Sequence, residues 1–443
     1  MPSEKKRICI IGAGASGLGC LRYFTENQER FDVVAYEQGS RIGGTWIYSD
    51  QRGSDKSGQP IHSSIYKSLV INIPKQIMAF PDFQFDSDLP SFFGHSEVLK
   101  YLEKYTEHFR LLPYIWFNTR VLMVKPKHIG DGLWGTKWNV NIEPLNNSHN
   151  SPSSNDFDAV IVCTGNVGGM LLYIFSQYAV PNIPDYPGLK KFKGTTIHSH
   201  SYRNPEIFRD KSVLTIGASF SGWDITTEVA SLAQYVYFSH RREHKLRHFP
   251  KNVELVSSVE AFTKNAVILT NGRQIAIDAV VFNTGYRHNF SFLSPDCGFE
   301  VTPDNTIRHL YKHTINIANP TLSFISILNN SLPFPCISIL ARFFKAVLEE
   351  QIKLPPRKEM LLAEQDELQK RLARNWPPRY LHRMEDFQFE MCDEIANEIG
   401  IETLPRWIKK LFDYHIVKLF ENIHTAKKYN YRIIEPDSFE IIP

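Results

Sequence analysis

The stretch RICIIGAGASGL, residues 7–18, decides the fold. A run rich in β-branched residues ends at Ile11, and Gly12, Gly14 and Gly17 follow it in G-x-G-x-x-G order. In a strand–turn–helix unit of this kind, the first glycine makes the tight turn, the second lets a diphosphate approach the backbone, and the third lets the helix pack close to the strand. The helix N-terminus then offers unpaired N–H groups to the diphosphate, so the turn predicts a dinucleotide site.

A second strand that ends in a carboxylate strengthens this prediction. FDVVAYEQ, residues 31–38, places Glu37 directly after an apolar run that includes Val33 and Val34. A carboxylate at this place can bind a ribose 2′-hydroxyl and would repel a 2′-phosphate. The predicted contacts of this first turn are Gly12, Ala13, Gly14, Ala15, Ser16, Gly17 and Glu37.

A second turn of the same kind lies in LTIGASFSGWDI, residues 214–225. The glycines Gly217 and Gly222 keep their places, while Ser219 stands where a glycine is usual. The next strand-like run, residues 234–240, leads into Arg241 and Arg242 instead of an acid. Arginines there accommodate a 2′-phosphate, so this site is predicted to prefer NADP over NAD. Its predicted contacts are Gly217, Ser219, Ser221, Gly222, Arg241 and Arg242.

Composition narrows the class of protein. The 443 residues, 42% of them apolar, are enough for two or three domains with large cores. The net charge of +3 comes from 50 basic and 47 acidic residues without a basic block, so nucleic acid is not expected as a partner. No apolar run approaches the roughly 20 residues that span a bilayer. The sequence has no CxxC pair, so it indicates neither a metal site nor a redox site of that kind. A cytoplasmic chain is expected, with peripheral contact to the endoplasmic reticulum left open.

Further motifs carry a resemblance to a known family. They are SRIGGTW at 40–46, IVCTG at 161–165, FKGTTIHSHSYR at 192–203 and VVFNTGY at 280–286. With them the chain resembles the class B flavin-containing monooxygenases of the N- and S-oxygenating type over most of its length. Baeyer–Villiger monooxygenases carry a tryptophan–proline pair where this chain has Tyr202 and Arg203.

The resemblance implies two cofactors and further site residues. FAD would be held at the first turn and NADPH at the second. The additional FAD contacts that it implies are Gly43, Gly44, Thr45, Trp46, Asn72, Val121, Thr164 and Gly165. Asn72, within the segment 64–85, is the candidate catalytic residue, because the family has an asparagine there at the reactive edge of the flavin. Ile71, Gln76 and Gln84 depart from the family pattern in the same segment.

The resemblance also implies a reaction. NADPH reduces FAD, O2 adds to form C4a-hydroperoxyflavin, and this oxygenates a soft nucleophilic N or S atom of a small amine or sulfide. A dry site protects the activated oxygen from water. Alternatives are a Baeyer–Villiger enzyme acting on ketones and an NADPH oxidase-like or inactive FAD-binding protein. A disulfide reductase has the same plan but would need the missing CxxC pair.

The expected architecture is α/β, with two Rossmann-like dinucleotide-binding domains and the NADP domain inserted into the FAD domain. We expect the FAD domain to comprise residues 1–180 and 290–443 and the NADP domain residues 181–289. Residues 350–443 are expected to form a helical scaffold, and a homo-oligomer is left open. Residues 167–177, VGGMLLYIFSQ, interrupt the family pattern. Whether they are a native loop or a retained intron stays open, and we expect them to be dispensable for folding.

Overall fold

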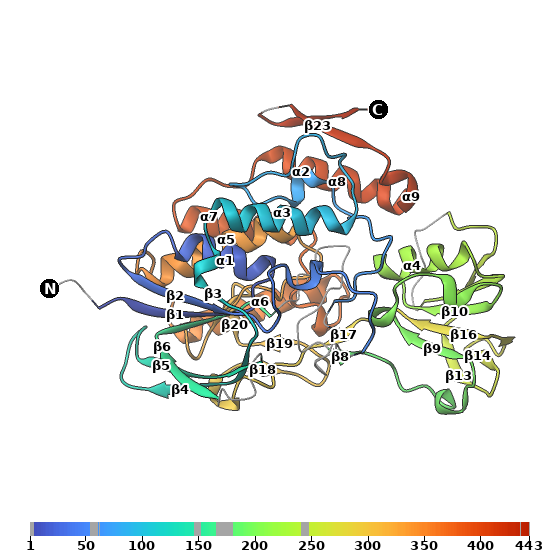
Figure 1. The fold of residues 1–443 in the computed structure, drawn as a ribbon, viewed down its shortest axis with the longest axis horizontal. Coiled ribbons are helices and arrows are strands. Elements are labelled where there is room, and N and C mark those ends of the chain that lie inside the picture. The colour runs from blue at the N-terminus through green and yellow to red at the C-terminus, as the bar shows by residue number, and fades with distance from the viewer. Residues whose placement is uncertain are drawn as a thin grey trace.

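The computed structural model describes residues 4–53, 61, 63–145, 152–164, 180–240, 248–434 and 436–442. Two sheets dominate it, one in each half of the molecule: a mixed sheet with a parallel centre and an all-parallel sheet (Figure 1). Gly165, Arg241, Arg242 and the segment 167–177 lie outside the described residues, and their predicted roles stay predictions.

The first sheet has seven strands in the order β20-β21-β22-β7-β1-β2-β3. Its central strands pair in parallel, with Ile8 opposite Val33 on one side and opposite Ala159 on the other. The bounds are β1 Lys6–Ile11, β2 Phe31–Tyr36, β3 Ile115–Trp116, β7 Ala159–Val162, β20 Leu310–Tyr311, β21 Ile315–Asn316 and β22 Leu322–Phe324. The chain therefore leaves this sheet after β7 and returns to it with β20 to β22.

Both faces of the first sheet are buried, because side chains alternate along each strand. Ile8 and Ile10 pack into a core shared with the helices α1, Ala15–Phe24, and α5, Pro333–Leu348. Cys9 and Ile11 pack on the other face, against the antiparallel sheet β4-β5-β6. The bounds of that sheet are β4 Thr119–His128, β5 Thr136–Pro144 and β6 Ser153–Phe157. This double coverage explains why residues 8–11 of β1 are all apolar and buried.

The second sheet has five parallel strands in the order β12-β11-β10-β16-β9. Their bounds are β9 Thr195–His198, β10 Ser212–Ile216, β11 Tyr235–Ser239, β12 Val253–Val256 and β16 Ala279–Phe282. Helix α4, Phe220–Ala230, contacts β10 and β11. Leu214 and Val280 face a small sheet of β13 Val259–Phe262, β14 Ala266–Leu269 and β15 Gln274–Ala276. The strands of the five-stranded sheet and of the small sheet all lie between β7 and β20 in the sequence. The predicted insertion of one Rossmann-like domain into another is therefore confirmed.

Further elements precede the last helices. They are α2 Lys75–Met78, α3 His95–His108, β8 Val180–Pro181, β17 Tyr286–Arg287, β18 Glu300–Val301 and β19 Ile307–Arg308. β8 pairs with β17 where the chain enters and leaves the second sheet (Figure 1).

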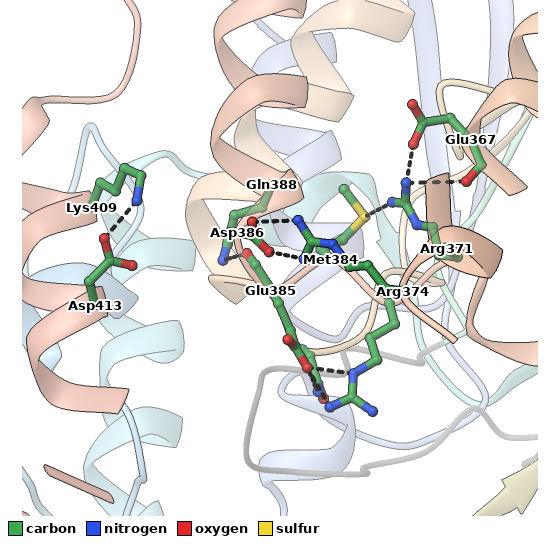
Figure 2. Close-up of polar contacts among 11 residues, drawn as sticks. Glu367, Arg371, Arg374, Met384, Glu385, Asp386, Gln388, Lys409 and Asp413 are labelled. Atoms are coloured by element: carbon green, nitrogen blue, oxygen red, sulfur yellow. Dashed lines mark hydrogen bonds and ion pairs between the residues drawn. The ribbon is translucent and has the colours of Figure 1, made fainter. Parts of the chain in front are cut away.

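The C-terminal region is helical, as predicted, and ends in a hairpin that the sequence analysis did not anticipate. Its elements are α6 Arg357–Ala373, α7 Phe387–Glu398, α8 Arg406–Glu421, α9 Ile423–Ala426, β23 Asn430–Ile434 and β24 Ser438–Ile442. Figure 2 shows ionic contacts within it: Arg374 donates to both oxygens of Asp386, at 2.6 and 2.8 Å, and the buried Arg371 contacts Glu367. Among the described residues, no helix is long and apolar enough to cross a bilayer.

Candidate functional site

The first turn needs its glycines for steric reasons. Gly12 has φ +101°, and a Cβ built on it would lie 2.7 Å from the carbonyl oxygen of Cys163. A Cβ on Gly17 would lie 1.9 Å from the carbonyl oxygen of Gly12, because α1 packs directly on the turn. The turn is therefore held between the ends of β1 and β7, at the carboxyl edge of the sheet. This edge is where open α/β sheets bind dinucleotides.

Glu37 follows β2 and reaches the same turn. Its carboxylate accepts hydrogen bonds from the backbone N–H groups of Ala13 and Gly39, both at 2.7 Å. Burial raises the pKa of this carboxyl, while the two N–H groups favour its ionised form. The predicted acid therefore lies beside the glycine turn, where it also orients the backbone of Ala13.

The RIGGTW segment, residues 41–46, packs against the first turn. The N–H of Gly43 donates to the carbonyl of Ala13 at 3.1 Å. A Cβ on Gly44 would lie 3.0 Å from the Cα of Gly14, so the two backbones face each other without side chains between them. Thr45 and the buried Trp46 continue this segment.

The polar side chains around this turn fit a large polar ligand. The hydroxyls of Ser16, Thr45 and Thr164 are buried and have no hydrogen-bond partner among the described residues. Thr164 follows β7, and its Cα lies 3.6 Å from the Cβ position built on Gly12. Buried hydroxyls normally find partners, so a ligand with several acceptors and donors, such as FAD, would satisfy this set.

Asn72 and Val121 lie apart from the turn itself. Asn72 is 2% exposed, and its backbone oxygen accepts a hydrogen bond from Nε2 of His415 at 2.8 Å. Val121 is buried in β4, close to the start of that strand, where Thr119 donates from its backbone to the carbonyl of Glu37 at 2.9 Å. Val121, predicted as an FAD contact, therefore lies near Glu37, while Asn72 lies against helix α8.

The second turn repeats the first in its steric detail. Gly217 has φ +104°, and its Cβ position lies 2.4 Å from the carbonyl oxygen of Asn283. The Cβ position of Gly222 lies 2.0 Å from the carbonyl oxygen of Gly217. Ser219 has an ordinary φ of −80° and is the N-cap of α4, where its hydroxyl accepts from the N–H of Gly222 at 3.4 Å. Serine is tolerated at this place because it needs no positive φ and caps the helix.

Helix α4 contacts the first half of the molecule through its charged side chains. The Tyr66 hydroxyl donates to Asp224, and the Ser68 hydroxyl donates to Glu228 at 2.5 Å. Lys427, just after α9, forms an ion pair with Asp224 at 3.2 Å. These contacts bring the segment 64–85 and the C-terminal region against the second turn.

A cavity lies at this junction. It is lined from one side by Ser64, Tyr66 and Leu69 and from the other by Ser219, Ser221 and Asn283. The cavity thus connects the second turn with the segment that contains Asn72.

Arg203 joins the linker to the loop that follows RIGGTW. The residue is 2% exposed and donates to five backbone carbonyls. The acceptors are Ser49, Gln51, Ser63, His200 and Tyr202, at 2.6 to 3.2 Å. The nearby His198 accepts a hydrogen bond from the backbone N–H of His200 at 3.1 Å. Burial lowers the pKa of His198 to about 4.

Comparison with known proteins places this architecture in a family. The family described as flavin-binding monooxygenase-like matches residues 5–248 and 247–441. Flavin-containing monooxygenase FMO GS-OX-like 3 of Arabidopsis thaliana is 32% identical over 428 residues, covering 93% of this chain and 91% of the relative. S-allyl-L-cysteine S-oxygenase from Allium sativum matches with a TM-score of 0.84 at 31% identity, with 96% of each chain covered. Tmm from Pelagibacter sp. strain HTCC7211 gives a TM-score of 0.83 at 25% identity, with 99% of this chain and 96% of that chain covered.

Two nucleotide-type turns on two Rossmann-like sheets define a flavoprotein of the two-dinucleotide class. Within that class, the chain belongs to the flavin-binding monooxygenase-like family, since the family match extends over nearly all of it. It is therefore a flavin monooxygenase whose cofactors are FAD and NADP(H). The resemblance inferred from the sequence motifs is confirmed.

The structure brings most of the predicted residues to two places. Those at the first turn are Gly12, Ala13, Gly14, Ala15, Ser16, Gly17, Glu37, Gly43, Gly44, Thr45, Trp46 and Thr164, and those at the second are Gly217, Ser219, Ser221 and Gly222. Sequence reasoning did not single out Asn283, the bonding of Arg203 or the contact of His415. The sequence did contain a signal for Asn283. The similar stretches VCTG at 162–165 and FNTG at 282–285 each follow an apolar run, and their alignment places Asn283 at the position of Cys163.

Proposed function

We propose that this chain uses NADPH and O2 to oxygenate a soft nucleophilic sulfur or nitrogen atom of a small molecule. The observation that carries the proposal is the pair of turns, with Glu37 at the first and, beside the second, a cavity that Ser64, Tyr66 and Leu69 also line. Sulfur is favoured over nitrogen, because the similar solved structure at 31% identity is that of an S-oxygenase.

The residues of the chain have distinct tasks in this reaction. Bound FAD would take a hydride from NADPH and activate O2 at its C4a position. The first turn and Glu37 would hold the adenosine diphosphate part of FAD, together with the RIGGTW segment that packs against the turn. Asn72, 2% exposed, presents its carboxamide within a buried segment and would stabilise the activated oxygen by hydrogen bonding.

Coenzyme choice and domain limits belong to the same proposal. Arg241 and Arg242 bind the 2′-phosphate of NADPH, and the domain limits lie near residues 180 and 290. β8 and β17 pair at these limits, which supports placing the junction there. A cytoplasmic location with peripheral contact to the endoplasmic reticulum is likewise proposed from the sequence alone.

A substrate panel tests the proposal. Purified FAD-loaded protein would be supplied with NADPH and, side by side, a thioether, a tertiary amine and a cyclic ketone. We expect substrate-dependent NADPH oxidation with sulfoxide as the major product and little hydrogen peroxide. Exclusive lactone formation from the ketone would show a Baeyer–Villiger enzyme. NADPH oxidation that yields hydrogen peroxide alone with every substrate would show an oxidase.

A further inference from the structure

Asn283 occupies the place in the second sheet that Cys163 occupies in the first. Cys163 follows β7 and donates its N–H to Ile11 at 2.9 Å, while Asn283 follows β16 and donates its N–H to Ile216 at 2.7 Å. Each carbonyl faces the first glycine of its turn. Each Cβ faces the last glycine, 3.7 Å from the Cβ position of Gly17 for Cys163 and 3.4 Å from that of Gly222 for Asn283. The two positions are therefore equivalent.

The two side chains differ in what they require. The thiol of Cys163 lies 3.7 Å from that of Cys20. A buried thiol behaves as a small apolar group and does not require a strong hydrogen-bond partner. The carboxamide of Asn283 has two N–H donors and an acceptor oxygen, and the residue is 5% exposed. Neither Nδ2 nor Oδ1 has a hydrogen-bond partner among the described residues. A buried amide without partners destabilises a protein, so it calls for a ligand that supplies them.

The strand order indicates which part of a bound coenzyme would reach Asn283. Strand β10 is central, with β11 on one side and β16 on the other. In this type of fold the adenosine half lies over the second strand, here β11, and the diphosphate lies at the helix N-terminus beside Ser219. The nicotinamide half would then extend to the opposite side, over the end of β16. That is where Asn283 lines the cavity together with Ser219, Ser221 and, from the other half of the molecule, Ser64.

We propose that the carboxamide of Asn283 hydrogen-bonds the nicotinamide half of NADP(H) and so positions it in the cavity between the two sheets. Its chemical counterparts are the ribose hydroxyls and the carboxamide of that half, which offer both donors and acceptors. The inference rests on the proposed NADP(H) site but concerns a residue outside the glycine turn and outside the 2′-phosphate contacts.

The test compares two nucleotides on FAD-loaded protein by isothermal titration. One is NADP+, and the other is adenosine 2′,5′-bisphosphate, which lacks the nicotinamide half. For Asn283→Ala we expect the Kd of NADP+ to rise about tenfold and the Kd of the bisphosphate to stay within about twofold. Because the amide has no protein partner among the described residues, the thermal midpoint without nucleotide should not fall. Asn283→Cys, which reproduces the first sheet, should behave in the same way.

Asn252→Ala is the matched control. Its amide donates to the carbonyls of Ala230 and Ala233 at the far end of α4, so we expect a lower thermal midpoint and an unchanged Kd for NADP+. Unchanged NADP+ affinity in Asn283→Ala, or equal weakening of both nucleotides, would overturn the inference. A lower thermal midpoint with unchanged NADP+ affinity would assign the amide a purely structural role. Wild-type protein that binds neither nucleotide would instead contradict the proposed NADP(H) site itself.

Discussion

Nε2 of His415 lies 2.8 Å from the backbone oxygen of Asn72, although 343 positions separate the two residues. His415 is 1% exposed, and its ring lies 5.0 Å from that of Phe92. Burial lowers the pKa of His415 to about 4, so the imidazole is neutral at physiological pH and donates from Nε2. The C-terminal helix α8 thereby holds the backbone of the proposed catalytic residue.

Removing this donor should disturb oxygenation more than nucleotide binding. His415→Phe keeps an aromatic ring but leaves the buried oxygen of Asn72 unsatisfied, at a cost of about 1–3 kcal/mol. We expect FAD content and NADP+ affinity to be retained, while the fraction of NADPH converted to hydrogen peroxide rises several-fold. His415→Gln, which can donate from its amide, should restore part of the coupling. Equal peroxide yields in wild type and His415→Phe would show that the contact has only a packing role.

Asn72 itself should control the fate of the activated oxygen. Asn72→Ala removes the carboxamide but keeps the backbone oxygen that His415 binds. We expect this variant to fold, bind FAD and consume NADPH, yet release hydrogen peroxide in place of oxygenated product. The measurement is the ratio of sulfoxide to peroxide at equal NADPH consumption. A ratio equal to that of wild type would remove Asn72 from the site.

Coenzyme preference should depend on Arg241 and Arg242. Charge-assisted hydrogen bonds to a phosphate contribute roughly 1.5–3 kcal/mol, so replacing both residues with alanine should weaken NADPH binding tenfold or more. NADH lacks the 2′-phosphate, and its binding should change little. The measurement is the steady-state KM for NADPH and for NADH in wild type and in the variant. Loss of affinity for both coenzymes to the same extent would show that the arginines do not read the 2′-phosphate.

Stability should decrease as the pH falls below 6.5. Burial lowers the pKa of His198 and of His415 to about 4, against an ordinary value of about 6.5. These histidines therefore bind protons more readily in the unfolded chain than in the folded one. The stabilisation of the folded state that is present above pH 6.5 is lost as the pH falls toward 4. At pH 5 each histidine should reduce the free energy of unfolding by about 2 kcal/mol. Urea unfolding of wild type and His415→Gln at pH 7.5 and pH 5 measures the difference, and an identical pH dependence in both would exclude His415 as a contributor.

The parts of the site that the sequence predicted are those encoded locally. Gly12, Gly17 and Glu37 follow one another within 26 residues, and each has a steric or electrostatic requirement that restricts the residue type. The seven-stranded sheet could be anticipated for the same reason, because its central strands are apolar runs that border these motifs.

Long-range contacts could not be predicted in this way. The hydrogen bond of His415 and the ion pair of Lys427 with Asp224 depend on how α8 and α9 pack against distant elements. A histidine or lysine in a helical charge pattern carries no mark of such a partner. Residues 350–443 were expected to form a helical scaffold, and two of their side chains contact the segment 64–85 and helix α4, which border the cavity.

The hydrogen bonds of Arg203 affect how the molecule unfolds locally. Its guanidinium donates to Ser49, Gln51 and Ser63 on one side and to His200 and Tyr202 on the other. Loosening either stretch of backbone would leave carbonyls of the other without their donor, so both stretches should open together. We therefore expect these two stretches to lose protection from amide hydrogen exchange together, and Arg203→Lys, which cannot donate to all five carbonyls, to lower that protection in both.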